Sequence, residues 1–278
     1  MVLKRPKVAV IMAAYNAEAT LPEAVGSVLA STLPAHLVIV DDVSRLQVSE
    51  LLRETMEQHP GRITVLRAPI NKGPSAARNQ ALAHIVEAGF EYAAVLDADD
   101  LSYEERFARQ ATFLDAHPAV AVVGTWGRAV DEHTLAVISN LTYPPATPAE
   151  IRRALCLDSC MINTSVMFRV AALNDMGSWD ESMYTGEDYD LFCRLARRYD
   201  LANIPQHLVD YRLSSQGISL TGIKDQRMAR LRVQLRHFPY RAHYWQAWAG
   251  VLKSAARILV PTAWVDNFKR VTNRQRVF

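Results

Sequence analysis

The sequence predicts an α/β fold, with a mostly parallel central sheet flanked by helices and a C-terminal helical extension. Over residues 7–124, short apolar runs of strand length alternate with segments of helical period, as in parallel sheets with right-handed crossovers. Polar clusters follow several of these runs, at the strand ends where such sheets bind ligands. The chain has 278 residues, half of them hydrophobic, which is enough for a sizeable core.

The first half of the chain alternates between strand and helix. Buried strands are expected at the apolar runs over residues 7–13, 37–40, 63–66, 92–96 and 119–123. Helices are expected between them, at residues 19–30, 49–57, 75–87 and 103–115. A parallel sheet built in this order brings the carboxyl ends of its strands to one rim.

After residue 124 the pattern changes. Further elements are expected in the order hairpin or irregular pair, short helix, strand, helix and strand, over residues 128–137, 149–155, 164–168, 189–199 and 208–213. From residue 222 onward the chain is expected to be helical and basic. We therefore expect one main domain over residues 1–220, with halves at about 1–124 and 125–220, and a basic helical extension over 221–278.

The stretch Asp97-Ala98-Asp99-Asp100 is the most unusual feature of the sequence, because it ends a buried strand with three carboxylates. Crowded carboxylates repel one another, and each is costly to remove from water. A divalent cation such as Mg²⁺ or Mn²⁺, shared with substrate phosphates, relieves both costs. The alternative is an acidic surface turn or a helix N-cap at Asp100. A phosphatase nucleophile motif is disfavoured, because it usually follows the first strand and this stretch follows the fourth.

Four polar clusters should meet at the rim of the sheet: Tyr15-Asn16, Asp41-Asp42, Asn71-Lys72 and 97–100. The turn at residues 14–18 contains no glycine, which argues against a dinucleotide-binding turn or a P-loop. The clusters therefore indicate a ligand site of another kind.

Several of these residues are suited to binding a nucleotide. Tyr15 can stack on a base while Asn16 holds the turn, although a Tyr packed on the sheet edge is the alternative. Asp42 can accept hydrogen bonds from a base or ribose, or simply form a turn. Lys72 and Arg78 flank a helix N-terminus, which is a natural anion site, although a solvated helix face is the alternative.

A second acidic pair, Glu187-Asp188, opens the helix expected at residues 189–199. A positioned carboxylate can act as general base and take the proton of a sugar hydroxyl. Helix capping is the alternative interpretation. Trp179 and Tyr184, just upstream, supply flat apolar surface of the kind that holds sugar rings.

Taken in order, these motifs resemble an inverting family 2 glycosyltransferase with the GT-A fold. The resemblance covers about residues 6–220 and is carried by the runs VAVIMAAYNAEATLPEAVGSVLAST, LVIVDDVS, NKGPSAARNQAL, AAVLDADD, GEDYDLFCRLARR and YRLSSQGIS. Each motif is weak alone, but their order and spacing are specific. The resemblance implies a nucleotide-sugar donor, with a UDP-sugar expected first, and a glycan or glycolipid acceptor.

The resemblance also implies residue roles. Around the nucleotide it places Ala14, Tyr15, Asn16, Glu18, Asp42, Arg78 and Asp97. Of these, Asp42 contacts the base and Asp97 faces the ribose. Asp99 binds Mn²⁺ or Mg²⁺ against the diphosphate, and Asp188 is the catalytic base, with Glu187 beside it in the acceptor site.

The sequence departs from the family pattern at two positions. Val43 follows Asp42 where a glycine usually stands, beside the residue that the resemblance assigns to the base. Ser214 stands where a late motif often has a His. If that His helps to hold the metal in relatives, this chain must use another group.

Charge is distributed unevenly along the chain. Residues 224–278 contain twelve Lys or Arg and two Asp or Glu, a net charge of +10, which leaves −8 for residues 1–223 out of the total of +2. The segment 243–263 has tryptophans at helical spacing among basic residues. Its apolar run does not reach the length needed to span a bilayer. Three roles are open for residues 240–278: contact with an anionic membrane, a helical cap on the domain, or a homodimer contact.

The cysteines and the N-terminal residues indicate the cellular compartment. Cys156, Cys160 and Cys193 form no disulfide or zinc pattern, and the apolar run after the basic N-terminus is too short for a signal peptide. A cytoplasmic protein is expected, and a peripheral position at the inner face of the membrane is left open. Nucleic acid is not expected as a partner, because the acidic rim would repel phosphate without a metal.

Two other functions remain open on the sequence alone. A sugar-phosphate nucleotidylyltransferase needs a glycine-rich, basic turn after the first strand, which residues 14–18 lack. A non-catalytic nucleotide- or membrane-binding module of the same fold would need no general base at Asp188.

Overall fold

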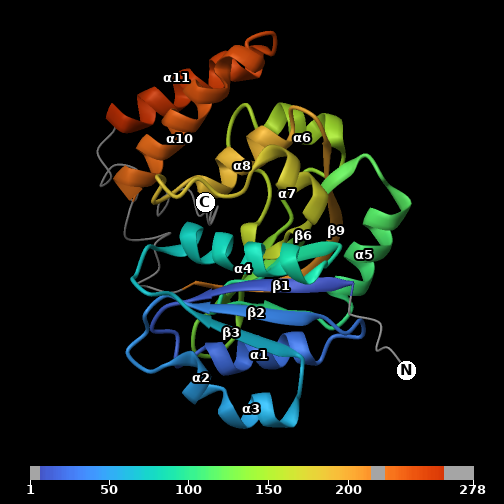
Figure 1. Ribbon diagram of the computed structural model, residues 1–278. Helices are drawn as coiled ribbons and strands as arrows, with labels where there is room; N and C mark the ends of the chain where they lie inside the picture. Colours follow the sequence, from blue (N-terminus) through green and yellow to red (C-terminus); the bar gives the residue numbers. More distant parts are fainter. Residues whose placement is uncertain (1–6, 214–222, 260–278) are drawn as a thin grey trace.

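A computed structural model describes residues 7–213 and 223–259, which form a central nine-stranded sheet flanked by helices (Figure 1). The strands run in the order β3-β2-β1-β4-β8-β6-β9-β5, and β7 pairs with β6. Their bounds are β1 Val8–Ala14, β2 His36–Asp41, β3 Ile63–Arg67, β4 Tyr92–Val95, β5 Leu101–Ser102, β6 Val120–Asp131, β7 Val137–Leu141, β8 Met167–Arg169 and β9 Asp200–Leu213.

The predicted parallel sheet is found in the first half of the chain. β3, β2, β1 and β4 pair in parallel, with Ala14 of β1 opposite Asp41 of β2 at their carboxyl ends. The second half is mixed: β8 lies between β4 and β6 and is antiparallel to both, whereas β6 and β9 are parallel. β7 follows β6 after a short turn, and so short a connection joins antiparallel strands.

Helices cover both faces of the sheet. Their bounds are α1 Leu21–Leu29, α2 Val48–Leu51, α3 Arg53–Gln58, α4 Pro74–Ala88, α5 Arg106–Ala116, α6 Pro148–Ala154, α7 Val170–Met176, α8 Glu187–Leu195, α10 Ile223–His237 and α11 Trp245–Leu259. The helix expected at residues 49–57 is divided at Leu52 into α2 and α3. Helix α7 and strand β5 were not expected from the sequence.

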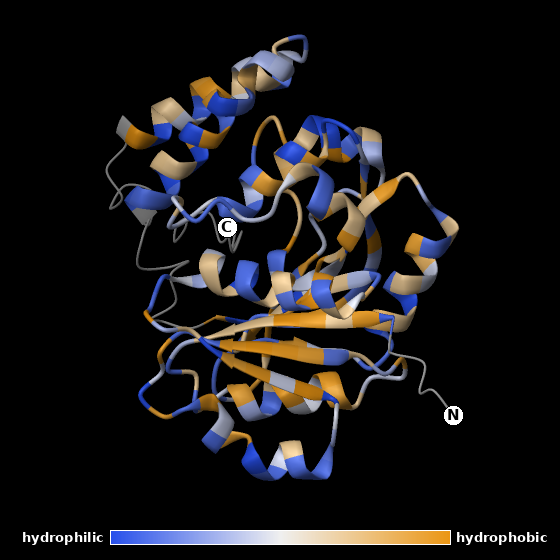
Figure 2. Cartoon of the chain, viewed as in Figure 1, coloured by the Kyte–Doolittle hydropathy of each residue, from blue (hydrophilic) through white to orange (hydrophobic). Residues whose placement is uncertain are grey.

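Two hydrophobic cores lie on opposite faces of the sheet. Ala9 and Ile11 of β1 pack in the core that includes residues of α4 and α8, while Val8 and Val10 pack in the core that includes residues of α1 and α5. Alternate side chains of a strand point to opposite faces, and both faces are covered here, so the strand is apolar throughout. Figure 2 shows this as hydrophobic strands in the middle of the molecule.

The C-terminal helices α10 and α11 pack against each other and dock on the domain beside α8 (Figure 1). The buried face of α11 is formed by Ala247, Gly250 and Ser254. A Cβ at Gly250 would lie 2.0 Å from the Cys156 carbonyl oxygen, so only glycine allows this close approach. The arrangement matches the helical-cap alternative for residues 223–259.

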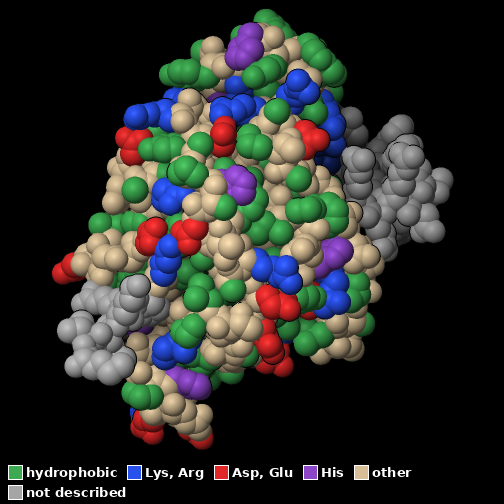
Figure 3. All heavy atoms as spheres, turned by 90° about the vertical axis from the view of Figure 1, so that its right-hand side faces the viewer, with side chains coloured by type: hydrophobic (Ala, Val, Ile, Leu, Met, Phe, Trp, Pro, Cys, Tyr) green, Lys and Arg blue, Asp and Glu red, His purple; other side chains and the backbone are tan. Residues whose placement is uncertain are grey.

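The outer face of α11 is apolar, since Trp245, Trp248 and Leu252 are exposed. Figure 3 shows hydrophobic and basic side chains together at the top of the molecule, where α10 ends and α11 begins. Within residues 7–213 and 223–259, no helix combines the length and apolarity needed to cross a membrane. The remainder of the segment 240–278, residues 260–278, lies outside the described residues.

Candidate active site

Hydrogen bonds join the segments that follow β1, β2 and β4. The N–H of Asn16 donates to the Ser44 hydroxyl (3.1 Å), and the Asn16 side-chain oxygen accepts from the N–H of Arg45 (2.9 Å). The Thr20 hydroxyl donates to the carbonyl of Ala98 (3.0 Å). Polar residues from separate strand ends thus meet at one rim, as their positions in a parallel sheet predict.

Asp42 holds the loop between β3 and α4. Its two carboxylate oxygens accept from the N–H groups of Lys72 (3.1 Å) and Gly73 (2.8 Å), and its carbonyl accepts from the Asn71 amide (2.9 Å). An ionised carboxylate has about four acceptor positions, so these two bonds leave capacity for a ligand. A pocket of about 310 Å³ opens beside Asp42 and Lys72, with Ile70 in its wall.

Arg78 lies near the start of α4, buried between two carboxylates. Its guanidinium donates to Asp97 (2.8 Å) and to Glu187 (2.9 Å), which is 109 positions away in the sequence. Burial lowers the pKa of Arg78, but the charges of Asp97 and Glu187 more than offset this and raise it above its ordinary value. A permanently charged side chain therefore joins the acidic turn after β4 to the start of α8.

The carboxylates of the acidic turn differ in their surroundings. Asp97 pairs with Arg78, whereas Asp100 is fully buried and accepts from the N–H of Arg212 (2.9 Å). Burial and the charge of Asp99 raise the pKa of Asp100 well above its usual range. Burial and the charge of Asp97 raise the pKa of Asp99 to about 6. Asp100 is not a helix N-cap, because α5 begins only at Arg106.

The acidic turn offers carboxylate oxygens, which are the ligands that a hard divalent cation prefers. Among the described residues, no three His, Cys, Asp or Glu side chains are grouped as a metal site. Mg²⁺ bound with a nucleotide, however, usually takes only one or two carboxylates, and phosphates and waters complete its shell. Asp99 fits this role, because its carboxylate makes no ion pair in the described part of the chain. Its pKa is raised by burial and by the charge of Asp97, and a bound cation would offset both effects.

Asp188 lies in the first turn of α8, directly after Glu187. The N-cap of α8 is Gly186, with φ +78°, so neither acidic residue is the cap. Burial and the charge of Glu187 raise the pKa of Asp188 to about 7. A carboxylate with a pKa near neutrality is well matched to accepting a proton. The contacts of Arg78 with Glu187 and Asp97 bring the start of α8 close to the acidic turn.

The aromatic residues differ sharply in exposure. Trp179 is 3% exposed and packs edge-to-face on Phe168, with ring centroids 5.7 Å apart. The expectation that Trp179 holds a sugar ring is therefore wrong, because its ring is part of the core. Tyr184 is 71% exposed and Tyr15 is 57% exposed, so both rings are accessible.

The remaining predicted residues lie close to the rim. Ala14 ends β1 and is buried, and Glu18 is half-buried before α1. Val43, which replaces the usual glycine, has φ +68°. Ser214 lies outside the described residues.

Sequence reasoning missed two fully buried charged residues that support the site. Arg106 donates to the Val95 carbonyl at the end of β4 (2.7 Å) and to Gln110 (3.1 Å), and burial lowers its pKa to about 9. Asp190 pairs with Arg194 (2.8 Å). Both residues have a partner four positions later in a helix, which is the one signal visible in the sequence.

The sequence profile described as glycosyl transferase family 2 matches residues 9–177, more than half of the chain. The chain belongs to glycosyl transferase family 2. It is 30% identical to the succinoglycan biosynthesis protein ExoU of Rhizobium meliloti over 233 residues, which cover 77% of this chain and 64% of ExoU. Membership of the family makes the protein a transferase enzyme.

Solved structures confirm the predicted GT-A fold. The structure of S. aureus TarS 1–349 in complex with UDP has a TM-score of 0.63 at 20% identity, covering 82% of this chain and 64% of that one. The mannosyltransferase PcManGT from Pyrobaculum calidifontis, in complex with GDP-Man and Mn²⁺, has a TM-score of 0.67 at 20% identity, with coverages of 94% and 72%. The chain thus spans a little less than two thirds of ExoU and of TarS 1–349.

Proposed function

We propose that this family 2 transferase moves a sugar from a nucleoside diphosphate to an acceptor hydroxyl with inversion, with a divalent cation at Asp99 and Asp188 as general base. The observation that carries the proposal is the double ion pair of Arg78, which brings the acidic turn after β4 and the start of α8 together. We therefore propose that the donor binds at the rim, between Asp99 and Asp188.

In the proposed step, the acceptor oxygen forms a bond to the anomeric carbon while the bond from that carbon to the diphosphate oxygen breaks. The hydroxyl proton passes to the Asp188 carboxylate, and the nucleoside diphosphate leaves with the bonding electron pair. Attack opposite the leaving group inverts the anomeric configuration. A Mn²⁺ or Mg²⁺ ion at Asp99 would neutralise charge that develops on the diphosphate.

The substrates are proposed from the relatives. TarS was solved with UDP and PcManGT with GDP-Man, both of which contain a nucleoside diphosphate. We propose a UDP-sugar as the donor to test first, and Asp42 and Tyr15 as the contacts to its base. The name of ExoU refers to succinoglycan biosynthesis, so the acceptor proposed here is a glycan or glycolipid in surface polysaccharide synthesis.

We also propose that the exposed stripe Trp245–Trp248–Leu252 on α11 contacts an anionic membrane. Residues 223–259 contain eight Lys or Arg and one Asp or Glu, and basic helices with tryptophans favour anionic interfaces. Co-sedimentation with vesicles of anionic and of neutral lipid tests this. A homodimer through the same stripe, detected by light scattering, is the competing outcome.

A thermal-shift panel of UDP, GDP, dTDP and CMP, each with and without Mn²⁺, tests the proposed function. We expect one nucleoside diphosphate to raise the melting temperature, and its effect to depend on Mn²⁺. Binding at 100 times the dissociation constant stabilises by about 2.7 kcal/mol, which is readily detected. No response to any nucleotide would contradict the proposal.

A further inference from the structure

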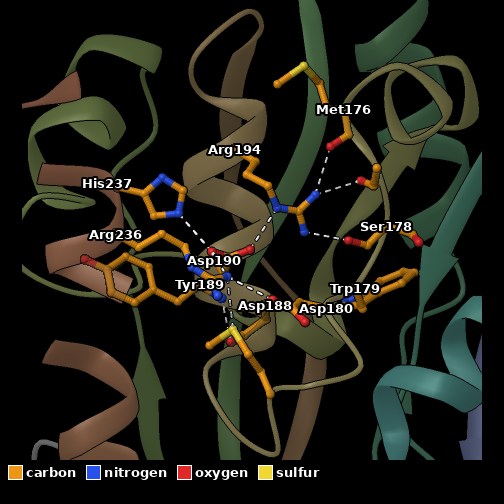
Figure 4. Close-up of polar contacts among 12 residues, drawn as sticks. Met176, Ser178, Trp179, Asp180, Asp188, Tyr189, Asp190, Arg194, Arg236 and His237 are labelled. Carbon is orange, nitrogen blue, oxygen red and sulfur yellow. Dashed lines mark hydrogen bonds and ion pairs between the residues drawn. The ribbon is translucent and has the colours of Figure 1, made fainter. Parts of the chain in front are cut away.

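Asp190 is a fully buried carboxylate two residues after Asp188, and two guanidinium groups and one imidazole converge on it (Figure 4). Arg194 donates to one of its oxygens (2.8 Å), while Arg236 (3.1 Å) and His237 (2.9 Å) contact the other. Burial raises the pKa of Asp190, but the hydrogen bonds from His237 and Arg194 outweigh this and hold it well below its ordinary value. Asp190 therefore stays ionised inside the protein.

Two of these partners belong to α10, which packs against the first turn of α8. A Cβ built on Gly186 would lie 3.3 Å from Ala229 Cβ and 3.8 Å from a Val233 methyl group, so α10 also contacts the residue before the acidic pair. Helix α10 thus touches the chain on both sides of Glu187 and Asp188.

The third partner, Arg194, extends the network toward α4. Its guanidinium donates to the carbonyls of Met176 (2.9 Å), Gly177 (3.0 Å) and Ser178 (2.5 Å), as Figure 4 shows. The next residue, Trp179, exchanges backbone hydrogen bonds with the Asn79 side chain (3.1 and 2.8 Å).

Asn79 is adjacent to Arg78 in α4, and Arg78 binds Glu187 in α8. The contacts therefore form a closed ring from α8 through Asp190 and Arg194 to α4 and back through Arg78.

We propose that Asp190 is a positioning residue, and that α10 acts through it to hold Asp188 in its working place. The proposal rests on the function proposed above for Asp188. Its physical basis is that a buried charge with three donors tolerates little displacement, since moving any donor leaves the charge less compensated. A base displaced by about 1 Å loses on the order of a hundredfold in rate.

The test compares His237→Ala, the conservative His237→Gln and Asp190→Asn with a matched control, Arg230→Met. Arg230 ties α10 to Asp158 (2.7 Å) without touching Asp190, so its loss loosens α10 elsewhere. We expect His237→Ala and Asp190→Asn to lower kcat by about tenfold to a hundredfold with little change in the KM of the donor. His237→Gln, which keeps a donor, should recover most of kcat, and Arg230→Met should leave kcat unchanged.

Amide hydrogen exchange at residues 186–190 gives a readout that does not need turnover. We expect faster exchange there in His237→Ala and not in Arg230→Met. Unchanged exchange, or an equal loss of kcat in Arg230→Met, would overturn the positioning role. Faster exchange in a protein whose wild type transfers no sugar would instead support the positioning contact and contradict the proposed function.

Discussion

Val43 should be a strained residue whose replacement by glycine stabilises the protein. It has φ +68°, in the left-handed region, where a β-branched side chain is a marked outlier. The residue before it, Asp42, is fixed in place because its carboxylate accepts hydrogen bonds from the N–H groups of Lys72 and Gly73. The strain is therefore imposed by contacts on which the rim depends.

The magnitude follows from two opposing effects. The left-handed conformation costs a residue with a Cβ roughly 1–2 kcal/mol, with the upper value expected for a β-branched residue such as Val. Glycine removes this cost but loses about 0.5–1 kcal/mol more conformational entropy on folding. The difference predicts that Val43→Gly raises the free energy of unfolding by about 1 kcal/mol, or about 2 °C in melting temperature.

Val43→Ala is the matched control, because it removes the same methyl groups and retains the Cβ. Urea unfolding of the three proteins, followed by circular dichroism, gives the free energies. We expect Val43→Gly to be more stable than Val43→Ala, by less than its gain of about 1 kcal/mol over wild type, because Ala is less strained than β-branched Val in this conformation. Equal stabilities of the two variants would refute the assignment of strain to the Cβ at this position.

Four further predictions concern the site. Asp188→Asn should lower kcat by about 10²–10⁴-fold without preventing nucleotide binding, as measured by initial rates of transfer and by titration. Since burial and Glu187 raise the pKa of Asp188 to about 7, and a base must be deprotonated, kcat/KM should fall as the pH is lowered through about 7. The same raised pKa means that protonated Asp188 stabilises the fold below about pH 4 and that this contribution is lost as the pH rises through 7, which urea unfolding across this range tests. Arg78→Met should destabilise by about 3 kcal/mol, because two carboxylates lose their buried partner, whereas Arg198→Met, which breaks an exposed pair with Asp175, should cost less than about 1 kcal/mol.

The sequence predicted those parts of the site that follow from local pattern. Apolar runs define the strands, and parallel strands bring their carboxyl ends together, so the convergence of the residues after β1, β2 and β4 follows from their positions. The acidic pair at the start of α8 was also visible in the sequence, because it directly precedes a segment of helical period.

Other features depend on tertiary packing that a single local pattern does not encode. The burial of Trp179 depends on its contact with Phe168. The position of β8 between β4 and β6 depends on which strands pair, and the hydrophobic period of a single strand does not specify its neighbours. The partners of Asp190 on α10 lie 46 and 47 positions away, so only Arg194 was within reach of a helical spacing.

The central claim is that Asp99 binds the cation and diphosphate while Asp188 acts on the acceptor. Calorimetric titration of the best nucleoside diphosphate with Mn²⁺, into wild type, Asp99→Asn and Asp188→Asn, tests it most directly. We expect Asp99→Asn to lose the Mn²⁺-dependent part of the affinity and Asp188→Asn to bind as wild type does. Wild-type binding by Asp99→Asn, or an equal loss in both variants, would contradict the claim.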